Sequence, residues 1–363
     1  MREVCDFVVI GLGAMGSAAL ASLSEHGRVI GLEAATPGHA GGSSHGESRI
    51  FRVSNFESPA YTPLAERSLA VWRGLEREAG EVYLPTGLLE AGASDSPIIA
   101  GRAGDASLER LSPADVHARY PVFDLPDGWS ATFQRDAGIL RADAAIRRQI
   151  ESVRQPDAVR IARAVSIEQR GDGVEVTTAD GQRIAAAAAV VTAGPWITAL
   201  IPALAGRIRV TLQTIGWFAP APAAPVGLGQ MPVFAFETGD AMELLYGFPD
   251  FAGLGVKAAA HAHGPEWSPG SPRPDQATQR AALAQVQAGL KRFVPGAGPL
   301  RATTTCLYSN TADEEFIVDR CPGRPNIVFA SACSGHGFKF APAIGAMLSE
   351  LARDPGAVAQ FPL

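Results

Sequence analysis

The chain has 363 residues, of which 47% are hydrophobic and 19% are charged, so it can bury a large core and is long enough for two domains. Its net charge of -6 and the lack of a basic cluster in the sequence argue against a nucleic-acid partner. No apolar run reaches the ~18 residues that span a bilayer, and residues 1–6 carry no signal-peptide pattern, so we expect a cytoplasmic protein without a membrane partner.

The first predicted element is a dinucleotide-binding turn. Residues 7–10 are typical of a buried strand, and Gly11, Gly13 and Gly16 follow at GxGxxG spacing before a helix predicted at 17–23. Glycines at this spacing allow a tight turn and bring the backbone close to a pyrophosphate, whose charge the helix N-terminus favours. A bare GxGxxG is weak evidence, so the flanking strand and helix carry the prediction.

A second strand, predicted at 29–32, ends in Glu33. An acidic side chain about 20 residues past the glycines suits the hydroxyls of an adenosine ribose and repels a 2′-phosphate. We therefore expect Glu33 to bind the ribose of the dinucleotide.

The segment from Gly42 to Arg52 is rich in glycine and serine and then abruptly basic. Such a loop can wrap the flat ring of a flavin and place cations near it. A solvated surface loop with ordinary arginines explains the same pattern equally well. The candidate residues in the segment are Ser43, Ser44, His45, Arg49 and Arg52.

Three later segments indicate that the dinucleotide-binding unit is discontinuous. Residues 159–168 alternate as one strand, and a hairpin over 174–182 leads into a buried strand within 189–196. A last strand at 326–330 precedes a helix at 344–352.

Lys257 ends an apolar run and is the next candidate. If the strand continues with a period of two, Lys257, Ala259 and His261 share one face, opposite Val256. Together with Tyr246, that face can line a pocket. Alone, Lys257 is more often an exposed residue of an edge strand.

Cys306 lies in a strand-like run, residues 303–308, upstream of a glycine-rich loop. In a chain with a dinucleotide fingerprint, a cysteine there can fix the cofactor covalently, and together these features suggest a flavoenzyme. A lone cysteine in a strand is more often a buried core thiol. The four cysteines have no CxxC spacing, so we expect no zinc site, no other metal and no disulfide framework.

The loop Ser334 to Lys339 precedes the last predicted helix, so its free amides are expected to face the ligand. Helix N-terminal amides stabilise the negative charge that a reduced flavin concentrates near N1 and the C2 oxygen. The candidate cofactor contacts are Gly335, Gly337 and Lys339, and Lys339 is also a candidate for a substrate carboxylate. Without a flavin, Lys339 would be interpreted as a surface lysine.

The predicted fold class is α/β (α+β). We expect a Rossmann-type FAD-binding domain from residues 1–85, 141–209 and 300–363. Residues 86–140 and 210–299 are expected to form a second, mostly antiparallel-sheet substrate domain, with strands at 216–219 and 244–248.

Along nearly its whole length the chain resembles the family of monomeric sarcosine oxidase, N-methyltryptophan oxidase and pipecolate oxidase. Two departures are local: Glu315 stands where a histidine is common, and Cys333 stands where an apolar residue is expected. The segments that carry the resemblance are residues 9–17, 42–52 with Tyr61, 192–196, 246–249 through Lys257 and His261, 306–308 with 313–314 and 316–319, and 334–340.

The resemblance implies an FAD-dependent oxidase of a secondary α-amino acid, which oxidises the amine to an imine and reduces O2 to H2O2. It implies a monomer whose partners are a small amino acid substrate and O2. Cys306 would carry FAD through a thioether, Arg52 and Lys339 would grip the substrate carboxylate, and Lys257 would promote oxygen reduction. The residues implied to line the site above the flavin are His45, Arg49, Tyr246, His261 and Tyr308.

Three alternatives stay open. The same fold can work as an FAD-dependent dehydrogenase that passes electrons to a quinone or carrier protein. A nicotinamide-dependent dehydrogenase leaves Cys306 unexplained, and an inactive FAD-binding scaffold leaves the set of Arg52, Lys257 and Lys339 unexplained. The substrate side chain is expected to be selected around Ala235 to Met242, where sarcosine, larger N-methyl amino acids and cyclic imino acids all remain candidates.

Overall fold

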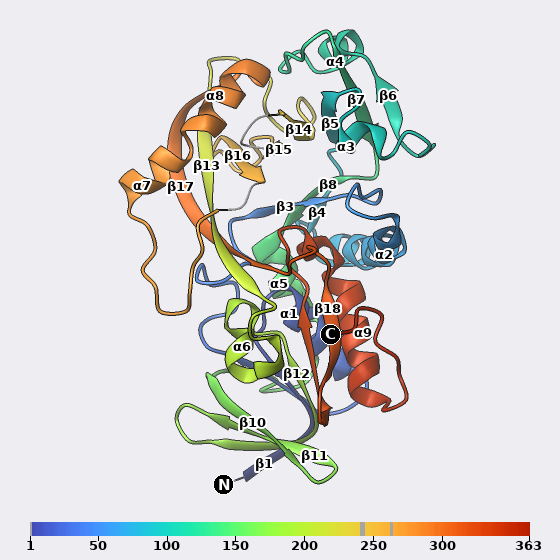
Figure 1. Ribbon diagram of the computed structural model, residues 1–363, viewed down its shortest axis with the longest axis vertical. Coiled ribbons are helices and arrows are strands. Elements are labelled where there is room, and N and C mark those ends of the chain that lie inside the picture. The colour runs from blue at the N-terminus through green and yellow to red at the C-terminus, as the bar shows by residue number, and fades with distance from the viewer. Residues whose placement is uncertain (1, 240–243, 262–263) are drawn as a thin grey trace.

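The computed structural model describes residues 2–239, 244–261 and 264–363. Within these ranges the chain forms two eight-stranded sheets and one three-stranded sheet. Figure 1 shows the large sheets at opposite ends of the long axis, with the small sheet between them. No helix in the same ranges is long and apolar enough to cross a membrane.

The first sheet is built on parallel strands that begin the chain. β1 (Arg2–Ile10) lies between β2 (Val29–Glu33) and β12 (Arg183–Val191). A parallel sheet is covered on both faces, so its strands are nearly continuous apolar runs, and β2 is buried along its whole length. The other strands of this sheet are β9 (Val159–Ile161), β10 (Ala164–Arg170), β11 (Gly173–Thr178), β18 (Ile317–Cys321) and β19 (Arg324–Ser331).

β12 is an interior strand of this sheet and joins three parts of the chain. Its first half pairs with β11 in an antiparallel manner, and its second half pairs with β19 in parallel. The predicted hairpin and the predicted late strand are therefore confirmed. The prediction of a single strand over 159–168 is wrong, because β9 pairs with β2 whereas β10 pairs with β11 on the other side of the sheet.

Helices cover the first sheet. α1 (Ala14–Ser24) and α9 (Ala341–Arg353) pack closely together, and α9 contains the predicted helix. A Cβ atom on Gly345 would lie 2.6 Å from the Cβ of Ala18, so only glycine permits this approach. The other elements of this part are η1 (Pro59–Tyr61), α2 (Thr62–Ala79), α5 (Ala142–Glu151), η2 (Gly194–Trp196), α6 (Ile197–Leu200), η3 (Pro202–Leu204) and η4 (Gly337–Phe340).

The second sheet is mostly antiparallel. The long strands β13 (Arg209–Pro220) and β17 (Ala297–Asn310) pair along almost their whole length, and β17 is the edge strand. The strands that follow in order are β16 (Val256–His261), β15 (Leu244–Phe248), β14 (Val233–Glu237), β5 (Leu88–Ala93), β7 (Trp129–Gln134) and β6 (Glu109–Leu111).

An aromatic core packs behind this sheet. Phe123, Phe234 and Phe236 contact one another edge-on or tilted, and Phe293 at the end of α8 (Ala284–Phe293) completes the cluster. Such ring pairs add about 0.5–1.5 kcal/mol beyond the area that they bury. The helices of this half are α3 (Pro97–Ala100), α4 (Pro113–Arg119), α7 (Gln276–Ala282) and α8 (Ala284–Phe293).

The small three-stranded sheet lies between the two large sheets. It consists of β3 (Ser48–Phe51), β8 (Gly138–Arg141) and β4 (Tyr83–Leu84). The mixed α/β architecture agrees with the predicted fold class. The expected domain boundary at 140/141 falls in β8 and the one at 299/300 falls inside β17, so the limits of the two domains stay a prediction.

Candidate active site

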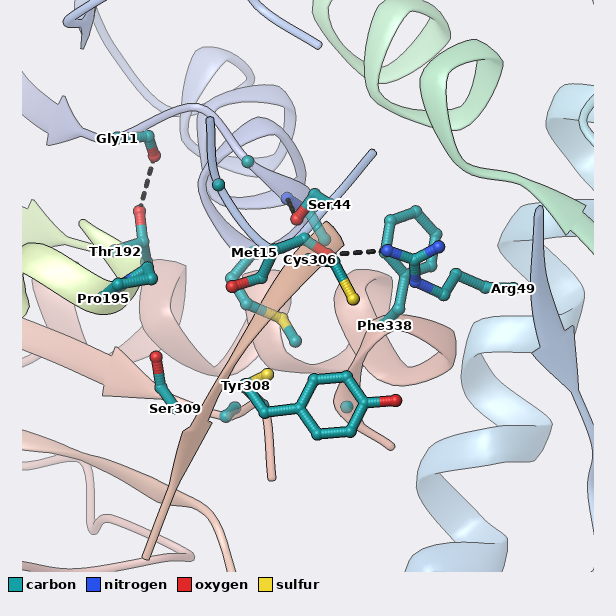
Figure 2. Close-up of a pocket in the computed structure, with 18 of the residues that line it drawn as sticks. Gly11, Met15, Ser44, Arg49, Thr192, Pro195, Cys306, Tyr308, Ser309 and Phe338 are labelled. Carbon is teal, nitrogen blue, oxygen red and sulfur yellow. Dashed lines mark hydrogen bonds between the residues drawn. The ribbon is translucent and has the colours of Figure 1, made fainter. Parts of the chain in front are cut away.

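A cavity of about 670 Å³ lies between the two large sheets. Its walls come from both sheets. Gly11 follows β1 and Glu33 ends β2 in the first sheet, and Tyr246 and Lys257 belong to the second. Ligands of open α/β sheets bind outside the carboxyl ends of the parallel strands. The cavity occupies that position. Figure 2 shows Gly11 and Thr192 on one side of it and Arg49 and Phe338 on the other.

The glycine turn after β1 is closed against the turn after β12. Gly11 has φ +87, and a Cβ atom on it would lie 2.6 Å from the carbonyl oxygen of Thr192. The hydroxyl of Thr192 donates to the Gly11 carbonyl at 2.8 Å (Figure 2). A Cβ on Gly16 would lie 1.8 Å from the same carbonyl. The turn therefore requires glycines, and it brings bare backbone and the start of α1 to the cavity wall.

Glu33 is buried at the end of β2, with 8% of its surface exposed. Its two carboxylate oxygens accept hydrogen bonds from the backbone N–H groups of Leu12 and Ala34, both at 2.7 Å. Oε1 also lies 3.5 Å from Nε2 of His39, whereas Oε2 has a further lone pair. Glu33 thus orders the glycine turn and keeps acceptor capacity beside the cavity.

The basic segment is not a solvated loop. The Arg49 guanidinium donates to the carbonyls of Ser43 at 2.6 Å and Ser48 at 2.8 Å, and Figure 2 shows it over the Phe338 ring. Ser44 accepts from the N–H of Ala14 at the start of α1. His45 is buried, and burial together with the Arg49 charge lowers its pKa to about 4. The surface-loop alternative is therefore wrong for this segment.

Lys257 is 3% exposed and lies beside this segment. Its Nζ is 2.6 Å from the Gly46 carbonyl oxygen and 2.9 Å from both the carbonyl and the hydroxyl of Ser48. Burial lowers its pKa. A neutral amine can donate to both carbonyls and accept from the hydroxyl, so this environment suits either charge state. The edge-strand alternative is wrong.

Lys257 and His261 both line the cavity, as their common face predicts, whereas Val256 packs into the aromatic core. His261 stacks at a tilt against Tyr308, with ring centroids 5.9 Å apart. Burial raises the pKa of Tyr246 to about 12 and holds the pKa of Tyr308 well above its ordinary value. Both phenols are therefore neutral donors at ordinary pH.

Cys306 lies on β17 with 2% of its surface exposed and lines the cavity next to Ile215 and Ala259. Burial raises the pKa of its thiol, and the charges of Arg49 and Lys257 act in the opposite direction. Figure 2 shows Cys306 near Ser44 and Arg49, where the glycine- and serine-rich loop meets β17.

The loop before α9 passes close to the rings of His261 and Tyr308. Gly335 has φ +74, and a Cβ on it would lie 2.6 Å from the His261 ring and 2.7 Å from the Tyr308 ring. A Cβ on Gly337 would lie 1.8 Å from the carbonyl oxygen of Ala332. The amides of this loop are less free than expected, because those of Ser334, His336 and Gly337 donate to carbonyl oxygens.

Arg52 is buried and faces two carboxylates. Its guanidinium forms ion pairs with Glu57 and, at 3.1 Å, with Glu90, and Glu90 also pairs with Arg102 at 2.6 Å. Glu57, Glu90 and Arg102 were not among the residues predicted from the sequence. Glu90 carried a signal, since it is an acid in the middle of the otherwise apolar strand β5, but Glu57 and Arg102 lie in segments without a pattern.

Lys339 is 3% exposed and donates from Nζ to the His336 carbonyl at 2.8 Å. Burial lowers its pKa to about 7, although the Glu57 carboxylate acts in the opposite direction. Arg52, Glu57 and Lys339 all line the cavity. The structure therefore brings the predicted pair of cations to one wall.

The two departures from the family pattern lie near this wall. The Tyr61 hydroxyl donates to Glu315, beneath the rings of Phe316 and His336. Cys333 is half-buried and lines the cavity with Cys306.

Comparison with known proteins gives a consistent result. The family model described as FAD dependent oxidoreductase matches residues 6–351. Monomeric sarcosine oxidase of Streptomyces avermitilis is 33% identical over 97% of this chain and 94% of its own length. N-methyl-L-tryptophan oxidase of Yersinia pestis is 31% identical over 96% of this chain and 95% of its own.

Solved structures share the fold. NikD, described as an unusual amino acid oxidase essential for nikkomycin biosynthesis, has a TM-score of 0.83 at 22% identity and covers 98% of this chain and 95% of its own. Glycine oxidase of Geobacillus kaustophilus has a TM-score of 0.77 at 17% identity over 96% and 95%. L-proline dehydrogenase of P. horikoshii has a TM-score of 0.76 at 19% identity over 97% and 94%.

Proposed function

The chain belongs to the FAD dependent oxidoreductase family, and from this premise we propose that it is an oxidase of a secondary α-amino acid. The amine becomes an imine, which hydrolyses, and O2 becomes H2O2. The observation that carries the proposal is the single cavity that holds the glycine turn, Cys306, Lys257 and the pair of Arg52 and Lys339.

The cavity fits FAD. Gly11 and Gly16 form a cradle that a side chain would fill, and Glu33 keeps a lone pair for a ribose. The hydroxyls of Ser43 and Ser309 are buried at the cavity without a hydrogen-bond partner, so they are available to a polar ligand. When bound, the flavin supplies a two-electron acceptor for the C–H bond next to the amine and passes the electrons to O2.

Arg52 and Lys339 are proposed to hold the substrate carboxylate. Two arginines and Lys339, in its protonated form, make one charged cluster with two carboxylates, those of Glu57 and Glu90. Of this cluster, Arg52, Glu57 and Lys339 line the cavity. One substrate carboxylate adds a third negative charge, so that the positive and negative charges of the cluster are equal in number. The second oxygen of Glu57 is buried without a partner, which leaves room for an N–H donor of the substrate.

The positive charge also bears on the substrate amine. Arg49, Arg52 and Lys339 line the cavity, while burial and nearby cations lower the pKa of His45 to about 4. Such a wall favours the neutral amine over the ammonium. A neutral amine keeps the nitrogen lone pair that the oxidation needs.

The substrate side chain would meet an apolar surface. Phe56, Ala235, Leu244 and Phe248 line the cavity near Tyr246. Of the segment expected to select the side chain, Ala235 belongs to β14, and residues 240–242 lie outside the described residues. The relatives named for sarcosine and for N-methyl-L-tryptophan differ greatly in substrate size, so we propose the secondary amino acid class and not one member of it.

Covalent attachment of FAD at Cys306 is part of the proposal. Support comes from the position of the thiol at the cavity wall, near cations that favour the thiolate. Acid precipitation should leave yellow flavin with the protein, and Cys306→Ala should release it. Cys333 also lines the cavity, so peptide mapping of the flavin is the control.

The test of the reaction is turnover in air-saturated buffer without another electron acceptor. A peroxide-coupled assay with sarcosine, larger N-methyl amino acids and cyclic imino acids should show stoichiometric H2O2 with at least one of them. The methyl ester of the best substrate should be poor, because it lacks the carboxylate. Flavin reduction by substrate without any peroxide would instead support the dehydrogenase alternative.

Lys257 separates the two alternatives further. A cation near the flavin favours the superoxide-like anion that forms when O2 takes its first electron, whereas hydride removal from a neutral amine gains little. Lys257→Met should therefore slow reoxidation by O2 far more than anaerobic reduction by substrate in stopped-flow experiments. Lys291→Met on the exposed face of α8 is the control. Equal losses in both steps would contradict an oxygen-specific role.

A further inference from the structure

A segment of the second half reaches back to the glycine- and serine-rich loop. Residues 264–275, here called the strap, run from β16 toward α7, and Figure 1 shows this segment descending below α7 toward α6. The Pro265 carbonyl accepts from the Leu212 N–H at 2.8 Å, and the Trp267 N–H donates to the Val210 carbonyl at 2.9 Å. The strap is thus fixed along β13.

The strap contains one basic residue, Arg273, and its side chain contacts the loop at the cavity. Arg273 donates from Nη2 to the Gly41 carbonyl at 2.7 Å and from Nη1 to the Thr305 hydroxyl at 3.4 Å. Gly41 lines the cavity and directly precedes the glycine- and serine-rich segment, and Thr305 directly precedes Cys306. Arg273 therefore joins the strap, the cavity loop and the strand that carries the thiol.

The local sequence holds this side chain in place. Arg273 stands between Pro272 and Pro274, which restrict the backbone on both sides, and Asp275 caps α7 by accepting from the Thr278 N–H at 2.8 Å. The guanidinium also packs on Trp267, with 5.1 Å from Cζ to the ring centroid. A rigid backbone and a stacked fork lower the entropy cost of the two hydrogen bonds.

The charge of Arg273 acts on the thiol as well. Burial raises the pKa of Cys306, and the positive charges of Arg49, Lys257 and Arg273 partly offset that effect. The thiolate is the nucleophilic form of cysteine. A cation on the Thr305 side therefore reduces the cost of forming it.

We propose that Arg273 is a positioning residue for covalent attachment of the flavin, because it locks the loop at Gly41 against the strand that carries Cys306. The inference rests on the proposed attachment at Cys306. In that step the S–H bond of Cys306 and one C–H bond of the flavin 8-methyl group break and an S–C bond forms. The two electrons enter the flavin ring, and O2 removes them with the two protons as H2O2.

The experiment follows attachment directly. Full-length protein prepared without flavin is mixed with FAD in air, and the flavin that stays with acid-precipitated protein is measured over time. Arg273→Gln should slow attachment at least about tenfold, the low end of the loss expected for one charge-assisted hydrogen bond. The amount of non-covalently bound FAD and the Tm should stay at the wild-type values. Arg280→Gln on the exposed side of α7 should behave as wild type.

Arg273→Lys keeps the charge but loses the fork that spans two acceptors, so it should also be slower than wild type. A wild-type rate in either Arg273 variant would overturn the inference, and so would a loss of attachment that merely follows a loss of bound FAD. If Arg273→Gln does not fold, a wild-type rate in Arg273→Lys alone would overturn the locking role. A wild-type protein that releases all its flavin would overturn attachment itself.

Discussion

Burial of Lys339 lowers its pKa, and this affects how the residue binds a carboxylate. Its pKa is lowered to about 7 because the ammonium is buried, so near neutral pH it is only partly protonated. A carboxylate ligand favours the charged form. Binding of such a ligand is therefore linked to a proton on Lys339.

The first prediction follows from that linkage. The Kd of propionate, a carboxylate without an amine, should be constant below about pH 7 and should rise by up to about tenfold per pH unit above it. Flavin absorbance titrations at several pH values measure this. Lys339→Met should bind propionate weakly at every pH, with the slope removed. A Kd that falls as the pH rises would contradict the role of Lys339.

The second prediction concerns the Glu90 carboxylate between Arg52 and Arg102. Arg102 is 7% exposed, and Arg102→Met leaves Glu90 with one cation instead of two. Removing one partner of a buried ion pair costs roughly 3–5 kcal/mol, and we expect the lower end because Arg52 remains. Urea unfolding measures the loss. Adding Glu90→Gln should recover part of it.

The control for that cycle is an exposed pair. Nη2 of Arg73 lies 2.5 Å from Oδ1 of Asp136, and the two side chains are 45% and 63% exposed. Arg73→Met should change the free energy of unfolding by at most about 1 kcal/mol. Similar losses for Arg73→Met and Arg102→Met would contradict the special position of Glu90.

At the scale of elements, the crossing of α1 and α9 depends on one glycine. The third prediction is that Gly345→Val lowers the free energy of unfolding by about 1–3 kcal/mol, because its side chain overlaps the backbone and Cβ of Ala18. In α2, an added Cβ on Gly74 meets its nearest atom at 3.9 Å. Gly74→Ala should therefore raise stability by about 0.5–1 kcal/mol. Urea unfolding should therefore show a lower free energy of unfolding for Gly345→Val and a higher one for Gly74→Ala.

Local patterns predicted many of the elements. The apolar runs of β1, β2 and β19 and the glycine turn after β1 each carry their own signal. The single strand expected over 159–168 was wrong because its alternation continues through a change of partner, from β2 to β11. Pairing is a property of the assembled sheet, so the pattern of one segment does not contain it.

The residues of the site were also only partly predictable from local sequence patterns. The glycine turn, Cys306 and Lys257 stand out by residue type and spacing, and the structure brings them to one cavity. Glu57 does not stand out because its segment carries no pattern, although its partner Arg52 is only five residues away. Arg273 does not stand out because it bonds to Gly41, 232 residues away. Long-range ion pairs and hydrogen bonds of this kind require the fold.

At the scale of the whole molecule, the cavity is where the two large sheets meet. The glycine turn and Glu33 come from the first sheet, and Tyr246 and Cys306 come from the second. A ligand that fills this space contacts both, so its binding energy adds to the stability of the folded chain as a unit.

The last prediction uses that coupling. Cys306→Ala protein freed of flavin should gain about 2.7 kcal/mol in free energy of unfolding when free FAD is added at 100 times its Kd, because the folded chain binds FAD and the unfolded chain does not. Urea unfolding followed by tryptophan fluorescence measures the gain, and riboflavin, which lacks the pyrophosphate that the glycine turn is proposed to bind, should give less. Glu33→Gln should reduce the gain at the same FAD concentration by weakening the ribose contact. Equal gains with riboflavin and FAD would place the binding energy in the flavin ring alone and would remove the role assigned to Gly11, Gly16 and Glu33.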